Sequence, residues 1–256
     1  MNSRLSLSAV LITKNAAGQL EDCLASLAFC DEIVVVDSGS DDGMAEIARR
    51  HGARVIQSDW RGFGPQKQFA VEQASHDWVL CIDADERVST SLQEGIRTAL
   101  GAVSPAPTSG AYRFARCNRF MGRYLRHGEG YPDWSLRLFD RRAARWSDDP
   151  VHERVIATGE IGTLQGDLLH ESAESLESYL AKQNRYSSLA ADAALASGER
   201  ATALQLVLSP LLRFVKFYVF RLGFLDGLPG LVHILIGCAA SFAKYAKMLA
   251  FQRSAQ

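Results

Sequence analysis

Short apolar runs alternate with helical patterns over the first hundred residues of the chain. The runs are continuous and rich in β-branched residues, which is typical of strands buried on both faces of a parallel sheet. Between the first two runs, Leu20, Leu24 and Leu27 share one helical face. The predicted strands are 7–13, 32–36, 54–57 and 78–82, and the predicted helices are 15–29, 43–51 and 64–74. This alternation indicates an α/β domain with a mostly parallel sheet flanked by helices.

The pattern changes after residue 100. Residues 101–110 are rich in Pro, Gly and Ser and predict a surface loop. Three short strands, one amphipathic helix and two apolar helices are predicted beyond it, at 112–117, 135–139, 151–156, 174–196, 203–222 and 228–250. We therefore expect an α/β domain over residues 1–172 and a helical extension over residues 173–256.

Charge separates these two parts of the chain. The 256 residues have a net charge of −1, which gives no reason to expect a nucleic-acid partner. Residues 201–256 nevertheless carry six Lys and Arg and only one acid, Asp226. Apolar helices with flanking cations suit an anionic membrane surface. Their apolar stretches are interrupted by charges before reaching the ~20 residues of a span, so we expect peripheral contact. The alternative is packing on the catalytic domain or a dimer interface.

The cysteines and the N-terminus bear on the compartment. The five cysteines are scattered and form no CxxC pair, which indicates free thiols in a reducing environment. The N-terminus lacks the basic and apolar regions of a signal peptide. The expected location is therefore the cytoplasm, at the inner face of the membrane.

Polar clusters follow three of the predicted strands. They are Thr13-Lys14-Asn15, Asp37-Ser38-Gly39-Ser40-Asp41 and Asp83-Ala84-Asp85-Glu86. Ligands of such sheets bind beyond the carboxyl ends of the strands, so the three clusters should converge. The first turn has no GxGxxG, which argues against a dinucleotide-binding dehydrogenase, and the chain has no GxxxxGK[ST] phosphate loop.

The strongest local signal is the pair Asp83 and Asp85. Carboxylates one residue apart point the same way in an extended segment. A hard divalent ion, Mg²⁺ or Mn²⁺, held by these oxygens and by phosphate oxygens would neutralise them. The alternative is a solvated loop that opens the next helix, with Asp85 or Ser89 as the cap.

A second signal is the cluster that begins at Asp37. This acid at a strand end can accept hydrogen bonds from a nucleobase or a ribose, beside Ser38, and Gly39 lets the backbone approach a ligand closely. The alternative is a turn that caps the helix beginning near Asp41 or Asp42.

Several motifs together resemble a known family. LITKN, VVVDSGS, GFGPQKQFA and WVLCIDADERVS are similar to family 2 glycosyltransferases with the GT-A fold. RFMGRYLRHGEGYPD, LRLFDRRAARW, PVHERV, LLHES and GFLDG resemble the lipopolysaccharide inner-core β-1,4-glucosyltransferase family, over about residues 7–250. The chain departs from that pattern at Ala16-Ala17, Asp41 and Glu129, and Glu129 bears on the choice of acceptor.

The resemblance implies an inverting, metal-dependent transfer of a sugar, glucose by analogy, from a UDP-sugar donor to a lipid-linked saccharide, the lipopolysaccharide core. Thr13 and Asp37 would contact the base and ribose, in the motifs that also hold Asn15, Ser38 and Gly39. Asp83 and Asp85 would bind the ribose and the metal–diphosphate unit. Lys67 would approach the base or diphosphate, or else is a surface lysine.

Four further residues are candidates for the chemistry. The base that deprotonates the acceptor hydroxyl is expected to be a carboxylate, Glu153 or Asp133. Glu153 is alternatively a surface residue paired with Arg154. Arg137 would bind phosphate in bidentate fashion, or is a buried partner of Asp133. His170 would complete the metal shell, or is a structural histidine.

Other functions share part of this pattern. A polyprenyl-phosphate glycosyltransferase has the same front half. A sugar nucleotidyltransferase usually opens with a glycine-rich phosphate loop, which is missing here. A non-catalytic membrane scaffold with the same fold would be expected to lose its acids, yet Asp37, Asp83, Asp85 and Glu153 are all present. The sequence leaves the oligomeric state open.

Overall fold

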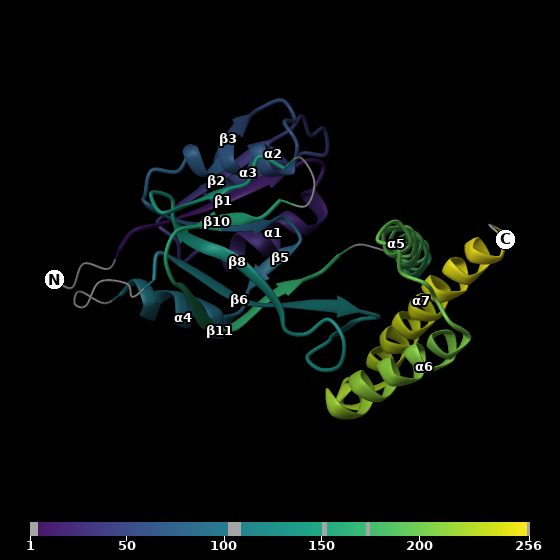
Figure 1. The fold of residues 1–256 in the computed structure, drawn as a ribbon. Helices are drawn as coiled ribbons and strands as arrows, with labels where there is room; N and C mark the ends of the chain where they lie inside the picture. Colours follow the sequence, from purple (N-terminus) through teal and green to yellow (C-terminus); the bar gives the residue numbers. More distant parts are fainter. Residues whose placement is uncertain (1–4, 102–108, 150–152, 173–174, 255–256) are drawn as a thin grey trace. The chain divides into compact units, whose positions relative to one another are not determined.

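The computed structural model describes residues 5–101, 109–149, 153–172 and 175–254 (Figure 1). The chain forms two compact units, which are described separately. The sheet unit comprises Met1–Cys117 and Asp133–Glu171, and the helical unit comprises Asn118–Pro132 and Ser172–Gln256. Residues 118–132, which the sequence analysis included in the α/β domain, thus belong to the helical unit.

A mixed sheet forms the centre of the sheet unit. Its described strands follow the order β3-β2-β1-β4-β8-β6-β11-β5. The strands of its parallel half are β1 Leu7–Thr13, β2 Glu32–Asp37, β3 Arg54–Gln57 and β4 Trp78–Asp83. The other strands are β5 Glu86–Val88, β6 Ala111–Phe120, β8 Asp133–Asp140 and β11 Ile161–His170. In that half the pairs β4–β8, β6–β8 and β5–β11 are antiparallel.

A separate two-stranded sheet consists of β9 Ala144–Trp146 and β10 Val155–Ala157. The predicted strand 151–156 overlaps β10, and its first two residues lie outside the described residues.

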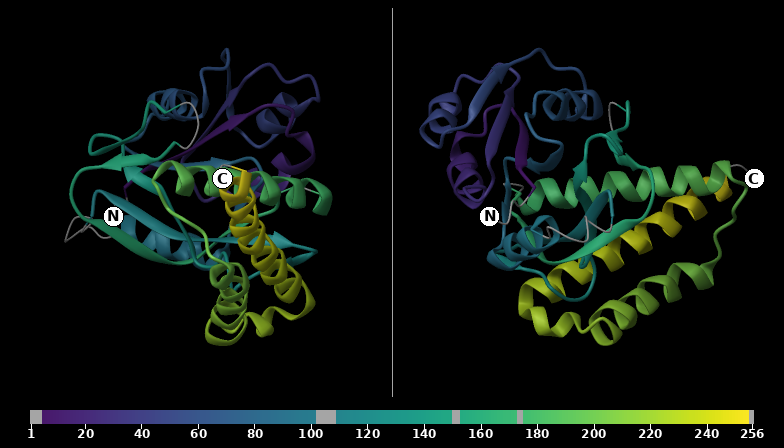
Figure 2. Two further views of the ribbon diagram at one scale, coloured as in Figure 1. Left: turned by 45° about the vertical axis from the view of Figure 1, so that its right-hand side comes forward. Right: turned by 90° about the vertical axis from the view of Figure 1, so that its left-hand side faces the viewer.

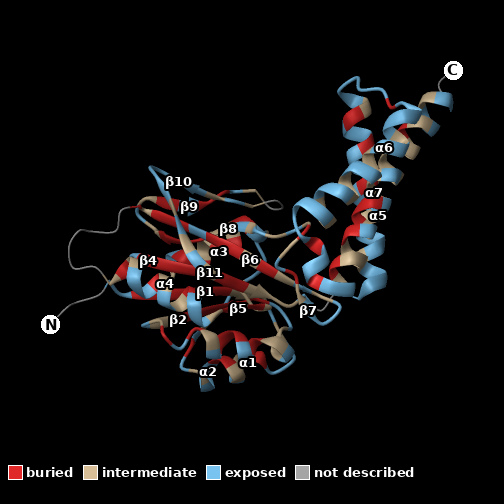
Figure 3. Ribbon diagram, turned by 90° about the horizontal axis from the view of Figure 1, so that it is seen from below, coloured by how far each residue is buried: buried red, intermediate tan, exposed pale blue. Residues whose placement is uncertain are grey.

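Helices cover both faces of the main sheet, as the continuous apolar runs predicted. One core contains residues of α1 Ala17–Ser26, α2 Met44–Arg50 and α4 Thr90–Leu100. The other contains residues of α3 Phe63–Glu72 and of β9. Successive strand residues point to opposite faces, so Leu11 joins the first core and Val10 joins the second. Figure 3 shows the resulting buried strands β1 and β4 in red.

Helix α4 begins shortly after the Asp-Ala-Asp-Glu segment. The Ser89 hydroxyl accepts a hydrogen bond from the Leu92 N–H at 3.3 Å, which caps the helix. Leu92, Ile96 and Leu100 recur every fourth residue and are buried in the first core. The start and the orientation of α4 are therefore fixed by its cap and by its apolar face.

Three helical segments make up most of the helical unit (Figure 2). Its elements are α5 Leu176–Ala196, α6 Ala203–Phe214, the π-helical turn η1 Val215–Phe220, the 3₁₀ turn η2 Gly223–Asp226 and α7 Gly227–Ser254. Both α5 and α6 pack on α7. Helix α6 starts with a capping box between Thr202 and Gln205.

Residues 118–132 are tied to the turn before α7. The short strand β7 Arg123–Tyr124 pairs with the end of β6. Asp226 is buried and accepts the backbone N–H groups of Arg126 at 2.9 Å and His127 at 2.8 Å. A buried carboxylate that receives several hydrogen bonds fixes this loop against the helices.

Of the two C-terminal helical runs, the first ends two residues before its predicted bound of 222, and the second extends beyond the predicted 228–250 at both ends. By length and composition, Ala203–Phe220 and Gly223–Ser254 are each long and apolar enough to cross a membrane. The charged residues that interrupt the apolar stretches do not end the helices, which continue through Arg213, Lys216, Lys244 and Lys247. Length alone does not assign a span, since the core helix of a soluble protein passes the same test.

Candidate active site

A cleft of about 630 Å³ opens at the carboxyl ends of β1 and β4. These two strands are parallel neighbours, and both have a further strand on their other side, so the cleft occupies the place where such sheets bind ligands. Its lining residues are Ile12, Thr13, Lys14, Trp60, Phe63, Lys67, Asp83, Asp85, Glu153 and His170. The cleft thus brings together candidates from five separate sequence motifs.

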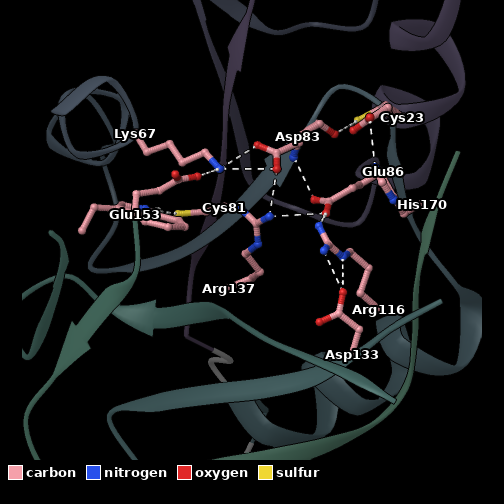
Figure 4. A network of polar contacts seen from close by, with 12 residues as sticks. Cys23, Lys67, Cys81, Asp83, Glu86, Arg116, Asp133, Arg137, Glu153 and His170 are labelled. Carbon is pink, nitrogen blue, oxygen red and sulfur yellow. Dashed lines mark hydrogen bonds and ion pairs between the residues drawn. The ribbon is translucent and has the colours of Figure 1, made fainter. Parts of the chain in front are cut away.

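Asp83, at the end of β4, is held between two cations (Figure 4). Lys67 Nζ lies 3.1 Å from Asp83 Oδ1, and Arg137 Nη2 lies 2.8 Å from Asp83 Oδ2. Burial alone would raise the pKa of Asp83, but the charges of Arg137 and Lys67 outweigh it and hold this pKa well below its usual range. Asp83 is therefore an anion whose charge is already neutralised by the protein.

Behind Asp83 lies a second, fully buried acid, Glu86. Its carboxylate accepts the Asp83 N–H at 3.0 Å, and its Oε1 lies 3.4 Å from Arg137 Nη2 and 3.6 Å from Arg116 Nη1. Burial raises the pKa of Glu86 against the opposing charge of Arg137. Glu86 and Arg137 thus form a buried support beneath the acidic segment 83–86, and no sequence motif indicates this role.

Asp133 is engaged by Arg116 and not by Arg137. Arg116 Nε and Nη2 donate to the same oxygen, Asp133 Oδ2, at 2.9 and 2.7 Å. The register of β6 and β8 places these two residues opposite each other. Arg137 lies four residues further along β8, which separates the two backbone positions by about 13 Å. The alternative that paired Arg137 with Asp133 is therefore wrong. Asp133 is also absent from the lining of the cleft.

Asp85 and His170 contact each other in the wall of the cleft. His170 Nε2 lies 3.1 Å from Asp85 Oδ2, and the two side chains are 20% and 31% exposed. The pairing of β5 with β11 brings them together, since His170 is opposite Glu86. Among the described residues no group of three or more His, Cys, Asp or Glu is placed to hold a metal ion.

These residues fit a metal ion that is held jointly by the protein and a bound ligand better than one held by the protein alone. A carboxylate oxygen and an imidazole nitrogen, both possible metal ligands, stand side by side at Asp85 and His170 within the same cleft. Asp83 is engaged by Lys67 and Arg137. A divalent ion bound here would take its remaining ligands from the diphosphate of a donor and from water.

Glu153 lies on the opposite wall and shares Lys67 with Asp83. Its Oε1 is 2.9 Å from Lys67 Nζ, and its side chain is 19% exposed. Lys67 also stands 4.8 Å above the ring of Trp146. The segment before Glu153 approaches α3 at Gly64, where an added Cβ would collide with the backbone oxygens of Ser147 and Asp149. Glu153 is therefore inside the cleft, and Lys67 is a buried cation rather than a surface lysine.

The Asp37 cluster lies at the neighbouring strand end. Asp37 is fully buried and accepts hydrogen bonds from the Ser40 N–H and hydroxyl and from Gln57 Nε2 at 2.7 Å. Ser38 Oγ accepts from Gln66 Nε2 at 3.1 Å, and Gly39 has a φ of 84°, which glycine adopts without strain. Thr13 and Lys14 line the cleft. The candidates Asn15, Asp37, Ser38 and Gly39 are not among its lining residues.

The turns after β1 and β2 also support each other. The Asn15 N–H donates to Ser40 Oγ at 2.8 Å, and Asn15 Oδ1 accepts the Asp41 N–H at 3.0 Å. Asp42 accepts the N–H of Met44 at the start of α2 and the N–H of Ala17 at the start of α1. Helix α2 begins at Met44 with Gly43 as its N-cap and without a side-chain capping hydrogen bond, so Asp42 joins the starts of α1 and α2 rather than capping either helix, and Asn15 makes structural contacts.

Sequence reasoning missed several residues of this site. Trp60 and Phe63 line the cleft in edge-to-face contact, with ring centroids 4.8 Å apart, and are 52% and 46% exposed. Exposed aromatic rings beside a cleft suit stacking on a base or sugar. Their signal was the pair of aromatics flanking Arg61-Gly62 in a polar loop. Glu86 and Arg116 are the other omissions.

The mixed sheet flanked by helices, with a cleft at the strand ends, defines a GT-A-like fold. The structure is similar to the mannosyltransferase PcManGT from Pyrobaculum calidifontis in complex with GDP-Man and Mn²⁺, with a TM-score of 0.51 and 18% identity, covering 96% of this chain and 88% of that one. It is similar to S. aureus TarS 1–349 in complex with UDP-GlcNAc, with a TM-score of 0.51 and 15% identity, covering 98% and 93%.

Sequence comparison narrows this class to one family. Residues 8–153 match the model of glycosyl transferase family 2, and the chain belongs to that family. It is 35% identical to the lipopolysaccharide core biosynthesis glycosyltransferase LpsC of Rhizobium meliloti, over 100% of this chain and 95% of that protein. It is 30% identical to an uncharacterized glycosyltransferase of Rickettsia prowazekii, over 94% and 86%. The predicted family, fold class and enzymatic nature are thereby confirmed.

Proposed function

We propose that this enzyme transfers a sugar, glucose by family resemblance, from a UDP-sugar to a saccharide of the lipopolysaccharide core, with inversion at the anomeric carbon. The acceptor class is supported by the full-length similarity to LpsC. The reaction type is supported by the cleft in which Asp83, Asp85, His170 and Glu153 converge. That convergence is the observation on which the proposal rests.

The donor lies in the cleft beyond β1 and β4. Thr13 at the end of β1 contacts the base or ribose, and the exposed rings of Trp60 and Phe63 offer surfaces for stacking. The buried Asp37 acts through the turn that it holds with Ser40 rather than from the lining of the cleft. Lys67 faces the diphosphate, because its ammonium lies between the two acids that flank the cleft.

Asp85 and His170 would hold a divalent ion, Mg²⁺ or Mn²⁺, together with the donor diphosphate. Such an ion supplies charge neutralisation for the departing diphosphate. The protein's own part is to keep two ligands 3.1 Å apart and to leave the remaining positions to the donor. Arg137 and Glu86, which bind Asp83 from behind, keep the acidic segment in place.

Glu153 is the proposed base. It accepts the proton of the acceptor hydroxyl while that oxygen forms a bond to the anomeric carbon. The bond from this carbon to the diphosphate oxygen breaks on the opposite face, and its electron pair leaves with UDP. The location of Glu153 in the cleft favours it over Asp133, which lies outside the lining and is bound by Arg116.

Membrane contact would bring the enzyme to its lipid-linked acceptor. The helical unit holds twelve Lys and Arg against six Asp and Glu, an excess that favours the anionic inner face of the cytoplasmic membrane.

The test is UDP release by the full-length protein with UDP-glucose and Mg²⁺ or Mn²⁺, against truncated lipopolysaccharide cores and against polyprenyl phosphate. Turnover on the core saccharide supports the proposal. Turnover on polyprenyl phosphate alone would assign the enzyme to that neighbouring class. Binding of UDP without turnover on either acceptor would contradict the acceptor class, and no binding of any UDP-sugar would indicate a scaffold with the same fold.

A further inference from the structure

The helical run from α6 into η1 turns an apolar face toward solvent. Its members are 41% to 68% exposed, and we call them the apolar stripe: Leu204, Val207, Leu208, Leu211, Leu212 and Val215. Spacings of three and four residues place them on one side of the helix. A soluble helix normally turns such a face inward. None of the described residues of α6 or η1 is buried, and Figure 3 shows α6 mostly in the colour of exposed residues.

The opposite face of the same run is already occupied within the helical unit. Ser209 Oγ lies 2.9 Å from Ser241 Oγ of α7, and Arg213 Nε lies 3.1 Å from Glu129 Oε2. These contacts, with the packing of α6 on α7, fix which side of the helix faces outward. The apolar stripe is therefore a built surface without a partner among the described residues, rather than the result of an undocked helix.

Charge indicates what covers the stripe. The helical unit has an excess of six positive charges, and Lys216 and Arg221 stand exposed directly after the stripe. Apolar side chains flanked by exposed cations match a lipid surface with anionic headgroups. We propose that the apolar stripe inserts into the headgroup–acyl boundary of an anionic bilayer, with the helix lying in the membrane plane. This specifies the membrane contact in the function proposed above, and rests on it.

The contacts of the other face exclude a spanning arrangement of this run. A helix of 18 residues is about 27 Å long, near the lower limit for crossing the ~30 Å hydrocarbon core, so charge rather than length opposes a span. Spanning would place the Arg213–Glu129 ion pair near the middle of the bilayer, where charged groups are expensive. In addition, α7 is bound to the polar helix α5, where Lys247 Nζ donates to Asn184 and Ser188. An in-plane helix keeps all of these groups on the aqueous side.

Flotation of the full-length protein with vesicles tests the proposal. The vesicles contain phosphatidylethanolamine and phosphatidylglycerol at about 3:1, with phosphatidylcholine vesicles for comparison. The double variant Leu211→Gln/Leu212→Gln removes the centre of the stripe without changing charge. The matched control is Leu180→Gln/Leu189→Gln, two leucines of α5 that are 45% and 53% exposed. Wild type and control should float with anionic vesicles, and the stripe variant should bind at least ~10-fold less, because two apolar side chains no longer leave water.

Four outcomes would overturn the proposal. They are a wild-type protein that never floats, equal loss in both variants, equal binding to phosphatidylcholine, and resistance to alkaline carbonate, which indicates a span. A fifth contradicting outcome is measured by sedimentation velocity. If the wild-type protein is a dimer, the stripe variant is a monomer and flotation is unchanged, the stripe is an interface between copies of the chain. UDP binding, measured by calorimetry in the same samples, separates the two proposals. If only the stripe proposal is wrong, the wild-type protein binds UDP but its flotation does not depend on the stripe. If only the donor proposal is wrong, flotation depends on the stripe but the wild-type protein does not bind UDP.

Discussion

Replacing Glu153 with Gln tests the proposed base separately from the donor site. The amide keeps the size of the side chain and an oxygen that can accept from Lys67, now at 2.9 Å, but it cannot take a proton. Lys67 also keeps its pairing with Asp83 at 3.1 Å, so the wall of the cleft should remain in place. The variant therefore changes proton acceptance more than it changes structure.

The magnitude follows from these contacts. General-base catalysis is commonly worth ~10²–10⁴-fold, or about 2.7–5.4 kcal/mol of transition-state stabilisation. The structural effect is smaller, because the Lys67–Glu153 ion pair becomes a hydrogen bond from the Lys67 ammonium to a neutral amide, at a cost of about 1 kcal/mol in unfolding free energy. We expect kcat to fall by at least ~10²-fold, while the Kd for UDP changes by less than ~5-fold.

Initial rates of UDP release give kcat, and calorimetry gives the Kd for UDP. Asp133→Asn is the matched control, because Asp133 lies outside the cleft and is bound by Arg116 at 2.7 Å. This control should lose at most a few-fold in kcat. An active Glu153→Gln enzyme together with an inactive Asp133→Asn enzyme would refute the reasoning and move the base to Asp133.

Three further predictions concern the metal, the buried ion pairs and acid stability. Asp85→Ala should lose at least ~10²-fold in turnover, and full activity of the wild type in excess EDTA would contradict a metal role. Arg137→Met leaves Asp83 and Glu86 without their shared cation and should lower the unfolding free energy by about 3–5 kcal/mol in urea titrations, with the 66%-exposed Arg142→Met as the nearly neutral control. Hydrogen bonds from Ser8 and Ser75 outweigh the opposing effect of burial and lower the pKa of Glu32 from 4.5 to about 2. The stability that Glu32 adds is therefore present above pH 4.5 and lost as pH falls toward 2, so wild type and Glu32→Gln should differ at pH 6 and converge near pH 2.

The parallel half of the fold was predictable because β1, β2 and β4 are buried on both faces and the shorter edge strand β3 follows the same alternation with helices. Residues 7–13 and 54–57 were predicted with the bounds of β1 and β3. The remaining strands are harder to predict, because β11 is buried only at Asp167 and Leu168 and its sequence includes two glycines and few β-branched residues. Helix α4 was anticipated only as an alternative, although Ser89 and the spacing of Leu92, Ile96 and Leu100 carried its signal.

The candidate site was predictable where function needs a residue at a strand end. Thr13, Asp83, Asp85, Glu153 and His170 all line one cleft. Their supporting partners were not predictable, because an ion pair between distant strands depends on register.

Arg116 meets Asp133 only because β6 and β8 are aligned at that pair. Glu86 is likewise recognisable only by its complete burial and by its contacts with Arg137 and the Asp83 backbone.

The shared position of Lys67 has a consequence for the order of substrate addition. Its ammonium has three N–H donors and contacts Asp83 and Glu153 at the same time. A donor diphosphate in the cleft would compete for these N–H groups and would free the Glu153 carboxylate to accept a hydrogen bond from the acceptor hydroxyl. The proposed base would thus become available to the acceptor only after the donor has bound. The steady-state signature is ordered addition, with the nucleotide sugar first, UDP leaving last and UDP inhibiting competitively against the donor.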